Sequence, residues 1–420
     1  MTLKRFWSGL LCGVLLVACL RQQTPEPTVL TWWITYAQDS AEYPAFQSIA
    51  EAFEKQTGVG VKLVSVAWSD IAPRGYGNTR LMQAQKEGNG PDLWGPLPHN
   101  WTAAFVAEGQ VRALERTQID NALQYLETAL WSCQVEETQY GLPVLFDSIA
   151  LIYNKALLAV PPKSMDELLA LARAHTDPAQ DRWGLVLPLV GPYHTYPFIE
   201  GYGGYAFRCE RNQCDINDIG LNNEGAVRGI QLLSDLYVKQ KLFPEPLIDG
   251  EVMNEYALNL FTAGRAAMLI DGPWVEAQIR AAGIDYGVAP IPPMPGATRA
   301  PRPFTLFQTM YISAYTAHPD ETIALVNYIA GPEGVQTLQK ALGRVPVRRD
   351  ILRSATFRNN EIVQGWYTQA IEGVPLPALP EMESLWYPWG YALQVAVPGL
   401  VPVQDALDQA VNEFKSYFKK

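Results

Sequence analysis

A single carboxylate, Asp147, interrupts an otherwise apolar run at residues 142–153. The run is rich in Val, Ile, Phe and Tyr, so it predicts a buried strand. Moving a carboxylate out of water is costly unless a cation or hydrogen-bond donors compensate it. Two interpretations follow: Asp147 is held in a structural ion pair, or the strand passes a polar cleft where Asp147 faces a ligand.

Aromatic side chains gather at three further places in the chain. They are Tyr193 and His194 in the loop predicted at 191–197, Trp274 after a predicted strand that ends at Asp271, and Trp386, Tyr387 and Trp389 in the tail segment 382–391. A lone Trp or Tyr more often packs in a core than contacts a ligand. These clusters alone therefore leave packing and ligand binding both open.

Common catalytic signatures are absent from the sequence. It contains no G-x-S-x-G, no H-E-x-x-H, no P-loop and no G-x-G-x-x-G after a predicted strand. Its four His lack metal-ligand spacing, so we expect no metal and no cofactor. The enzymatic alternative is a lipid-anchored glycoside hydrolase, which needs two carboxylates about the scissile bond. Asp147 with Glu381 or Glu383 would be the candidates.

Cys209 and Cys214 bracket a four-residue polar segment with hairpin spacing. Opposite residues of a hairpin come within disulfide reach, and an oxidising compartment favours the bond. A metal site is the competing interpretation, but it would need further Cys or His nearby. We predict a disulfide. Cys133 is expected to be a buried small hydrophobic residue.

Length and charge narrow the class of protein. A chain of 420 residues exceeds what one hydrophobic core usually supports, so two domains are expected. Hydrophobic residues make up 48% and charged residues 18%, as in ordinary globular proteins. The net charge of −11 argues against a nucleic-acid partner, because phosphate binding needs clustered Lys and Arg.

The N-terminus has the pattern of a targeting segment. Lys4 and Arg5 precede a short apolar run that ends in Leu16-Val17-Ala18-Cys19. This run resembles a bacterial lipoprotein signal, which implies cleavage before Cys19 and a lipid on its sulfur; an ordinary secretory signal with an incidental Cys is the alternative. We expect residues 1–18 to be the signal and residues 19–28 a tether. Both alternatives place the mature protein outside the cytoplasm.

Strands and helices alternate at short intervals in the first part of the chain. Strands are predicted at 29–35 and 59–66, and helices at 46–57 and 79–86. Ser164 with Glu167 has capping-box spacing at the start of another helix. Further helices are predicted at 222–240, 319–330, 332–342 and 403–418, and strands at 183–189 and 302–312. This order predicts an α/β protein whose first part holds a largely parallel sheet.

Five motifs occur in an order that resembles the extracellular solute-binding proteins of sugar ABC importers, most closely the maltose- and maltodextrin-binding proteins. They are Gly90-Pro91-Asp92, LPVLFDSIALIYNKALL with VPPKSMDELL, GGYAF followed by DINDIGLNNEGA, MLIDGPW, and Pro380-Glu381-Met382 followed by Leu385-Trp386-Tyr387. The resemblance covers about residues 29–417.

This resemblance implies a periplasmic-binding-protein type II fold, with two α/β lobes joined by chain crossovers around a ligand cleft. The N-terminal lobe is expected at 29–146 plus about 306–351, and the C-terminal lobe at 147–305 plus about 352–420. In such a receptor, generally a monomer, the lobes close on the ligand, and the permease recognises the closed form.

The family's sugar site suggests roles for individual residues. Its aromatic platform corresponds to Tyr193, Trp274, Trp386 and Tyr387, and Asp147 stands where the family has Glu. Aromatic faces cover the C–H faces of a pyranose ring, while carboxylates, amides and Arg bind its hydroxyls.

Several positions depart from the family pattern. Maltose binders carry charged residues that bind sugar hydroxyls at several positions. At these positions this chain has the region of Asp39, Asn100 and Trp101, Gly191, and Gly390. It has His194 where the family has Phe. We hypothesise that Trp101, Trp389 and His194 compensate in a more aromatic pocket, with Asp39 and Asn100 as further candidate contacts.

The predicted protein is therefore a non-enzymatic receptor, periplasmic or on the cell surface and held by lipid at Cys19. Its expected ligand is a small oligosaccharide or glycoside: a maltose-like disaccharide, trehalose, sucrose or a glucosylated polyol. A non-sugar solute in the same fold is the remaining alternative. Among such solutes the aromatic cleft argues against a metal or phosphate and less against a polyamine, because cations also bind aromatic faces.

Overall fold

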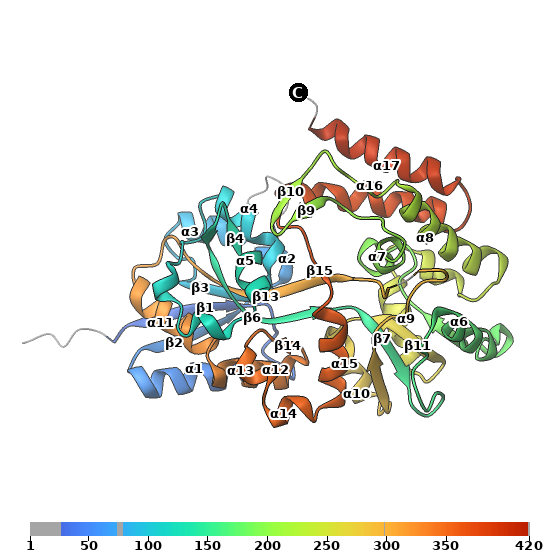
Figure 1. Ribbon diagram of the computed structural model, residues 1–420. Coiled ribbons are helices and arrows are strands. Elements are labelled where there is room, and N and C mark those ends of the chain that lie inside the picture. The colour runs from blue at the N-terminus through green and yellow to red at the C-terminus, as the bar shows by residue number, and fades with distance from the viewer. Residues whose placement is uncertain (1–26, 74–78, 298, 419–420) are drawn as a thin grey trace, which may run out of the picture.

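The computed structural model describes residues 27–73, 79–297 and 299–418. The predicted signal, the anchor Cys19 and the tether up to residue 26 lie outside the described residues. Within the described part, no helix is long and apolar enough to cross a membrane. Two separate sheets, each flanked by helices, lie at opposite ends of an elongated molecule (Figure 1).

The larger sheet has seven strands and contains the first part of the chain. Its order is β14-β6-β13-β3-β1-β2, and β15 pairs with β13. These strands are β1 (Val29–Ile34), β2 (Gly60–Ser65), β3 (Leu93–Pro98), β6 (Gly141–Ser148), β13 (Phe304–Ile312), β14 (Val345–Pro346) and β15 (Val374–Pro375).

The strands from the first part of the chain run in one direction, as expected, and the complete sheet becomes mixed through the later strands β13 and β14. β1 pairs parallel with β2 and with β3. β13 pairs antiparallel with β3 and with β6, and β14 pairs antiparallel with β6. Because β13 returns from the other half of the molecule, it enters the sheet in the opposite direction, which the local sequence does not indicate.

Helices of the first half follow the predicted apolar periodicity. In α1, Phe46, Ile49 and Phe53 are buried, and Gly58 ends the helix with a left-handed φ of 76°. The helices of this half are α1 (Tyr43–Thr57), α2 (Trp68–Ile71), α3 (Arg80–Lys86), η1 (His99–Trp101), α4 (Thr102–Ala107), α5 (Glu127–Ser132), α11 (Pro319–Ile329), α12 (Pro332–Leu342), α13 (Arg349–Leu352) and α14 (Ala355–Arg358). A small ribbon, β4 (Gln134–Val135) with β5 (Thr138–Gln139), follows α5.

The second sheet has four strands in the order β12-β7-β11-β8. They are β7 (Ala150–Asn154), β8 (Trp183–Val186), β11 (Ala266–Asp271) and β12 (Tyr286–Ala289). The helices of this half are α6 (Met165–Ala174), α7 (Pro192–Glu200), α8 (Glu224–Ser234), η5 (Asp235–Lys239), α9 (Met253–Thr262), η7 (Pro273–Val275), α10 (Glu276–Ala281), α16 (Pro380–Ala396) and α17 (Val403–Tyr417). Its hairpin consists of β9 (Arg208–Glu210) and β10 (Gln213–Asp215).

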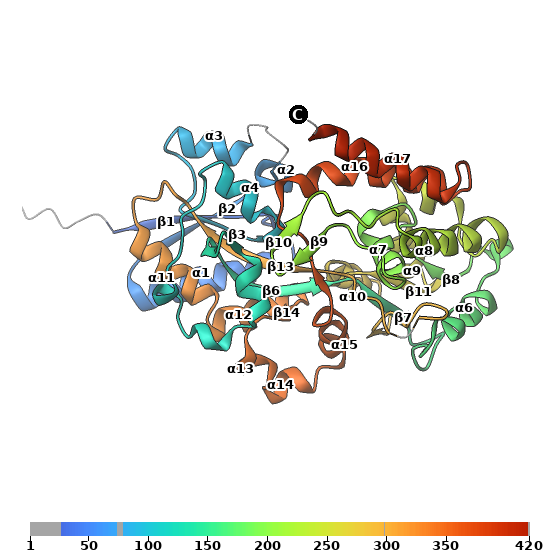
Figure 2. The ribbon, with the colours of Figure 1, turned by 45° about the horizontal axis from the view of Figure 1, so that its top comes forward.

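The apolar run 142–153 forms two strands instead of the single one expected. β6 ends at Ser148 in the larger sheet, and β7 begins at Ala150 in the second sheet, so only Ile149 separates them. Figures 1 and 2 show the chain passing from β6 at the centre directly into β7. Both strands are buried throughout. The apolar pattern identifies burial, but it carries no signal for the change of sheet.

The predicted aromatic loop at 191–197 is also corrected, because these residues begin helix α7. Pro192 occupies the first helical turn, where its missing N–H costs no hydrogen bond, and Thr195 Oγ1 donates to Gly191 O at 3.0 Å. Two prolines and several aromatic residues make this segment read as a loop in the sequence, whereas tertiary packing stabilises it as a helix.

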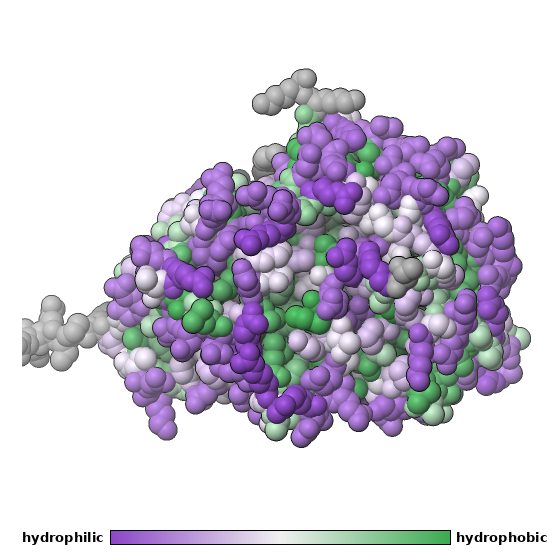
Figure 3. Space-filling view, viewed as in Figure 1, coloured by the Kyte–Doolittle hydropathy of each residue, from purple (hydrophilic) through white to green (hydrophobic). Residues whose placement is uncertain are grey.

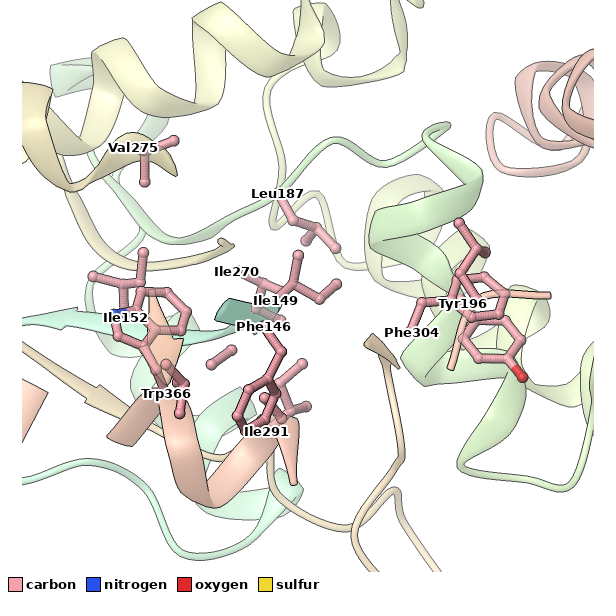
Figure 4. Packing of buried hydrophobic residues seen from close by; sticks show 14 of the residues in the cluster. Phe146, Ile149, Ile152, Leu187, Tyr196, Ile270, Val275, Ile291, Phe304 and Trp366 are labelled. Carbon is pink, nitrogen blue, oxygen red and sulfur yellow. The ribbon is translucent and has the colours of Figure 1, made fainter. Parts of the chain in front are cut away.

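One continuous hydrophobic cluster joins the two sheets. Phe146, Ile149 and Ile152 follow one another along β6 and β7 within it, and Trp366 of α15 (Glu361–Ala370) belongs to the same cluster (Figure 4). Phe304 and Tyr196 stack with ring centroids 3.6 Å apart. On the outside, the face shown in Figure 3 is mostly hydrophilic, with hydrophobic residues in small separate patches. The junction between the sheets is therefore a packed region.

Candidate functional site

Asp147 lies near the end of β6, beside the point where the chain leaves the larger sheet, and its side chain is 0% exposed. Its Oδ2 accepts hydrogen bonds from Arg344 Nε at 2.6 Å and from Gln308 Nε2 at 3.0 Å. Arg344 Nη1 also donates to the Tyr36 hydroxyl at 2.8 Å. Of the two sequence interpretations, the structure shows the ion pair. The second oxygen, Oδ1, has no hydrogen-bond partner among the described residues, so contact with a ligand remains a prediction.

The carboxylate of Asp147 affects, and is affected by, ionisable groups on both sides of the junction. Burial raises the pKa of Asp147, and the guanidinium of Arg344 opposes the rise. Burial raises the pKa of Tyr193 well above its ordinary value, and the nearby carboxylates of Asp147 and Asp271 add to this effect. Tyr193 therefore keeps its proton, and its hydroxyl donates to Phe304 O at 3.3 Å.

The second half contributes Tyr193, His194 and Trp274 to one group. α7 positions the first two, and Trp274 follows β11 in η7. The ring centroids of Tyr193 and Trp274 lie 6.0 Å apart. His194 Nε2 lies 3.3 Å from Asp271 Oδ1, which also accepts from Gly272 N at 2.7 Å. Trp274 remains 37% exposed, so its ring is accessible at the mouth of the group.

Aromatic rings continue from this group to α16. Tyr193 and Phe304 have centroids 6.0 Å apart, and Phe304 and Trp386 6.3 Å apart. Trp386 stacks on Trp389 with an interplanar angle of 8°. The rings of Trp274, Tyr193, Phe304 and Trp386 thus form a continuous series, here called the aromatic lining. Phe304, which is 1% exposed, is its buried member, and the sequence did not indicate it.

The first half meets this lining through Asn100 and Trp101 in η1. Asn100 Nδ2 donates to Glu383 Oε1 on α16 at 3.4 Å, while Asn100 Oδ1 is buried without a partner among the described residues. Burial raises the pKa of Glu383, and the side chains of Trp386 and Trp101 oppose the rise by hydrogen bonding. Trp101 also packs on Trp68 with centroids 4.6 Å apart. Asn100 and Trp101 therefore face the C-terminal aromatic segment, and their contact with a ligand stays a prediction.

Two small cavities flank this region. One of about 60 Å³ is lined by Tyr36 and Arg344 from the first half and by Trp274 from the second. The other, of about 180 Å³, lies between α4 and the start of α16 and includes Glu383. Both are smaller than the 300 Å³ or more typical of ligand pockets. The two halves are in contact in this region, through Asn100 and Glu383.

Three predicted residues lie outside this group. Asp39 is exposed in the turn after β1, and its carboxylate makes no ion pair with the described residues. Tyr387 is 73% exposed, because a residue next to Trp386 on a helix points about 100° away from it. Trp389 is 0% exposed and lies behind Trp386, so it supports the lining and is not part of its surface. Ligand contacts of these three residues stay predictions.

Sequence reasoning missed several polar members of the group. Arg344 and Gln308 come from two segments whose local patterns carry no site signal. Asp271 stands inside the MLIDGPW motif, and the sequence suggests Glu383 only as a carboxylate of the alternative hydrolase. An available signal for Tyr36 was its place just beyond a parallel strand, since ligands bind at the carboxyl ends of such strands.

The predicted disulfide is present between Cys209 and Cys214, which face each other across β9 and β10. Cys133 is buried as expected, and burial raises its pKa to about 12. It is therefore a packed thiol without nucleophilic character at neutral pH.

Residues 48–365 match the family described as bacterial extracellular solute-binding protein. The chain belongs to this family. These receptors bind solutes, and no enzymatic role is part of the family description. Relatives include the galactooligosaccharide-binding protein of Bacillus subtilis strain 168, which is 28% identical over 91% of this chain and 88% of its own length. The maltooligosaccharide ABC transporter solute-binding lipoprotein of Streptococcus pneumoniae strain R6 is 26% identical over 98% of this chain and 95% of its own length.

Solved structures show that this receptor has the type II periplasmic-binding-protein fold. A cyclo/maltodextrin-binding protein complexed with maltotetraose superposes with a TM-score of 0.81, at 28% identity over 95% of this chain and 99% of that one. The predicted fold and family resemblance are thereby confirmed.

Proposed function

We propose that this receptor captures a small oligosaccharide between its two halves and delivers it to the transmembrane subunits of an ABC importer. The observation that carries the proposal is the aromatic lining Trp274, Tyr193, Phe304 and Trp386 at the junction of the two sheets, with buried Asp147 and Glu383 beside it. Apolar faces and charged hydrogen-bond acceptors in one site are what a pyranose ring requires.

The names of the relatives support an oligosaccharide as ligand. Proteins similar to this chain bind galactooligosaccharides, maltotriose and maltodextrins. The guanidinium of Arg344 balances the negative charge of Asp147. The groups that remain to bind uncharged sugar hydroxyls are mainly the second carboxylate oxygen of Asp147, Asn100 and Glu383. We include trehalose, sucrose and glucosylated polyols as candidate ligands on the basis of the departures around Asn100 and His194.

The accompanying proposals concern lobes and location. We propose lobes at 29–146 plus about 306–351 and at 147–305 plus about 352–420, acting as a monomer and anchored by lipid at Cys19. The two sheets support this division, with the exception that β15, at residues 374–375, pairs with β13 in the larger sheet. Family membership places the receptor outside the cytoplasm, and the pneumococcal relative is a lipoprotein.

Calorimetric titration tests the proposed ligand class. The panel contains maltose, maltotriose, a galactooligosaccharide, trehalose, sucrose and glucosylglycerol. We expect saturable binding of at least one saccharide and no release of reducing sugar. Release of reducing sugar would instead favour the hydrolase, while absence of binding across the panel would contradict the proposal.

A further inference from the structure

The disulfide-bonded hairpin of the second half reaches across to the first half. β9 and β10 extend toward β4 and α5 (Figure 1), and Asn212 Nδ2 at the hairpin tip donates to Gln134 O at 2.7 Å. The Cys209–Cys214 bond joins the two strands directly below this tip. The tip is therefore a covalently restrained contact between the two halves.

Arg211, next to Asn212, faces a cavity of about 250 Å³ formed by this contact. The cavity is lined by Arg116, Arg211, Arg349, Glu127, Tyr125 and Trp131, among others. Arg211 comes from the second half, whereas the other five belong to the first. The cavity thus combines a surface of the first half with one side chain of the second half.

The charge around this cavity is strongly positive. Its lining holds three guanidinium groups and one carboxylate, Glu127. None of the three arginines forms an ion pair with a carboxylate of the described residues; Arg349 Nε donates to Tyr125 O at 3.1 Å. The nearby Arg348 is paired with Asp350 at 2.8 Å, so it adds little net charge. Convergence of three cations at one cavity is unexpected in a chain of net charge −11.

We propose that this cavity binds a phosphate-class oxyanion, held by Arg116, Arg211 and Arg349. Guanidinium groups donate paired hydrogen bonds that match phosphate oxygens, and they bind such anions more strongly when several converge. A volume of about 250 Å³ exceeds that of bare phosphate, so a diphosphate or a small phosphate ester fits better. The Trp131 ring offers an apolar wall for an ester group.

The site also predicts coupling to the ligand cleft, a consequence that rests on the proposed function. An anion held by Arg211 on one side and by Arg116 and Arg349 on the other stabilises the closed arrangement. By thermodynamic linkage, the factor by which it tightens saccharide binding equals the factor by which the saccharide tightens anion binding.

Titration of the full chain with pyrophosphate, at constant ionic strength set with NaCl, tests the site directly. We expect saturable binding that weakens about tenfold in Arg211→Gln and in Arg349→Gln, because each variant removes one charge-assisted contact. The matched control is Arg208→Gln on the same hairpin: its guanidinium pairs with Asp218 at 3.4 Å and does not line the cavity. This control should bind pyrophosphate as the wild type does.

The outcomes separate the site from its alternatives. No saturable binding of pyrophosphate, inorganic phosphate or phosphatidylglycerol vesicles by the wild type, or equal weakening in Arg208→Gln, would overturn the proposal. Inorganic phosphate and phosphatidylglycerol vesicles serve as further probes. Binding of the soluble anions supports a free phosphate ligand. Binding of vesicles alone, lost in Arg211→Gln, supports a lipid headgroup as the source of the phosphate. Circular dichroism of each variant controls for folding. Because these titrations contain no sugar, their result stands whether or not the saccharide proposal holds.

Discussion

Removing the carboxylate of Asp147 tests the ion pair at the crossover. In Asp147→Ala, the Tyr36 hydroxyl is the one partner left to Arg344 among the described residues, and the Arg344 side chain is 12% exposed in the wild type. Breaking a buried pair by deleting one member leaves an uncompensated charge, which costs about 3–5 kcal/mol. We therefore expect the free energy of unfolding to fall by about that amount, because Gln308 also loses its acceptor.

Urea unfolding followed by tryptophan fluorescence measures this loss. The double variant Asp147→Ala/Arg344→Met removes the orphaned charge and keeps an unbranched apolar chain at position 344. Its loss should be smaller than the sum of the two single losses by about 2 kcal/mol or more, which a double-mutant cycle reports directly. Single losses below about 1 kcal/mol, or losses that simply add, would refute the buried pair.

Three further predictions follow from exposure and burial. Trp274→Ala should weaken saccharide binding about tenfold by calorimetry and change the unfolding free energy little, because the ring is 37% exposed; unchanged affinity would remove Trp274 from the site. Trp389→Ala should cost about 3–5 kcal/mol in urea unfolding, because its ring is 0% exposed; a loss below about 1 kcal/mol would contradict core packing. Burial lowers the pKa of His99 to about 3. Below about pH 6.5 the unfolded chain therefore binds a proton at His99 that the native chain does not bind, and the free energy of unfolding falls as the pH falls. His99→Asn, which keeps an acceptor for Phe307 N, should reduce the stability lost between pH 7 and pH 5 by about 2 kcal/mol; an unchanged pH dependence would contradict the neutral buried histidine.

Elements with strong local signals were predictable from the sequence. The apolar period and terminal Gly58 define α1, and the N-cap Ser164, which accepts from Glu167 N at 3.1 Å, defines α6. The hairpin spacing of Cys209 and Cys214 gives the disulfide. In each case the residues that determine the element lie within a few positions of one another.

The unpredicted features depend on contacts between distant segments. Asp147 and Arg344 lie 197 positions apart, so no local pattern distinguishes the ion pair from a ligand contact. Helix α7 begins with Pro192 and contains Pro197, which in isolation indicate a loop. Tyr387 and Trp389 show the same limit: the tail motif identifies an aromatic cluster, but only the helix of α16 determines which rings face the junction.

Calorimetric titration of the wild type and of Trp274→Ala with maltotriose, followed by the rest of the saccharide panel, tests the central claim most directly. Saturable binding of at least one saccharide by the wild type, weakened about tenfold in the variant, is the predicted result. No binding of any saccharide, or equal binding by both proteins, would contradict a sugar site on the aromatic lining.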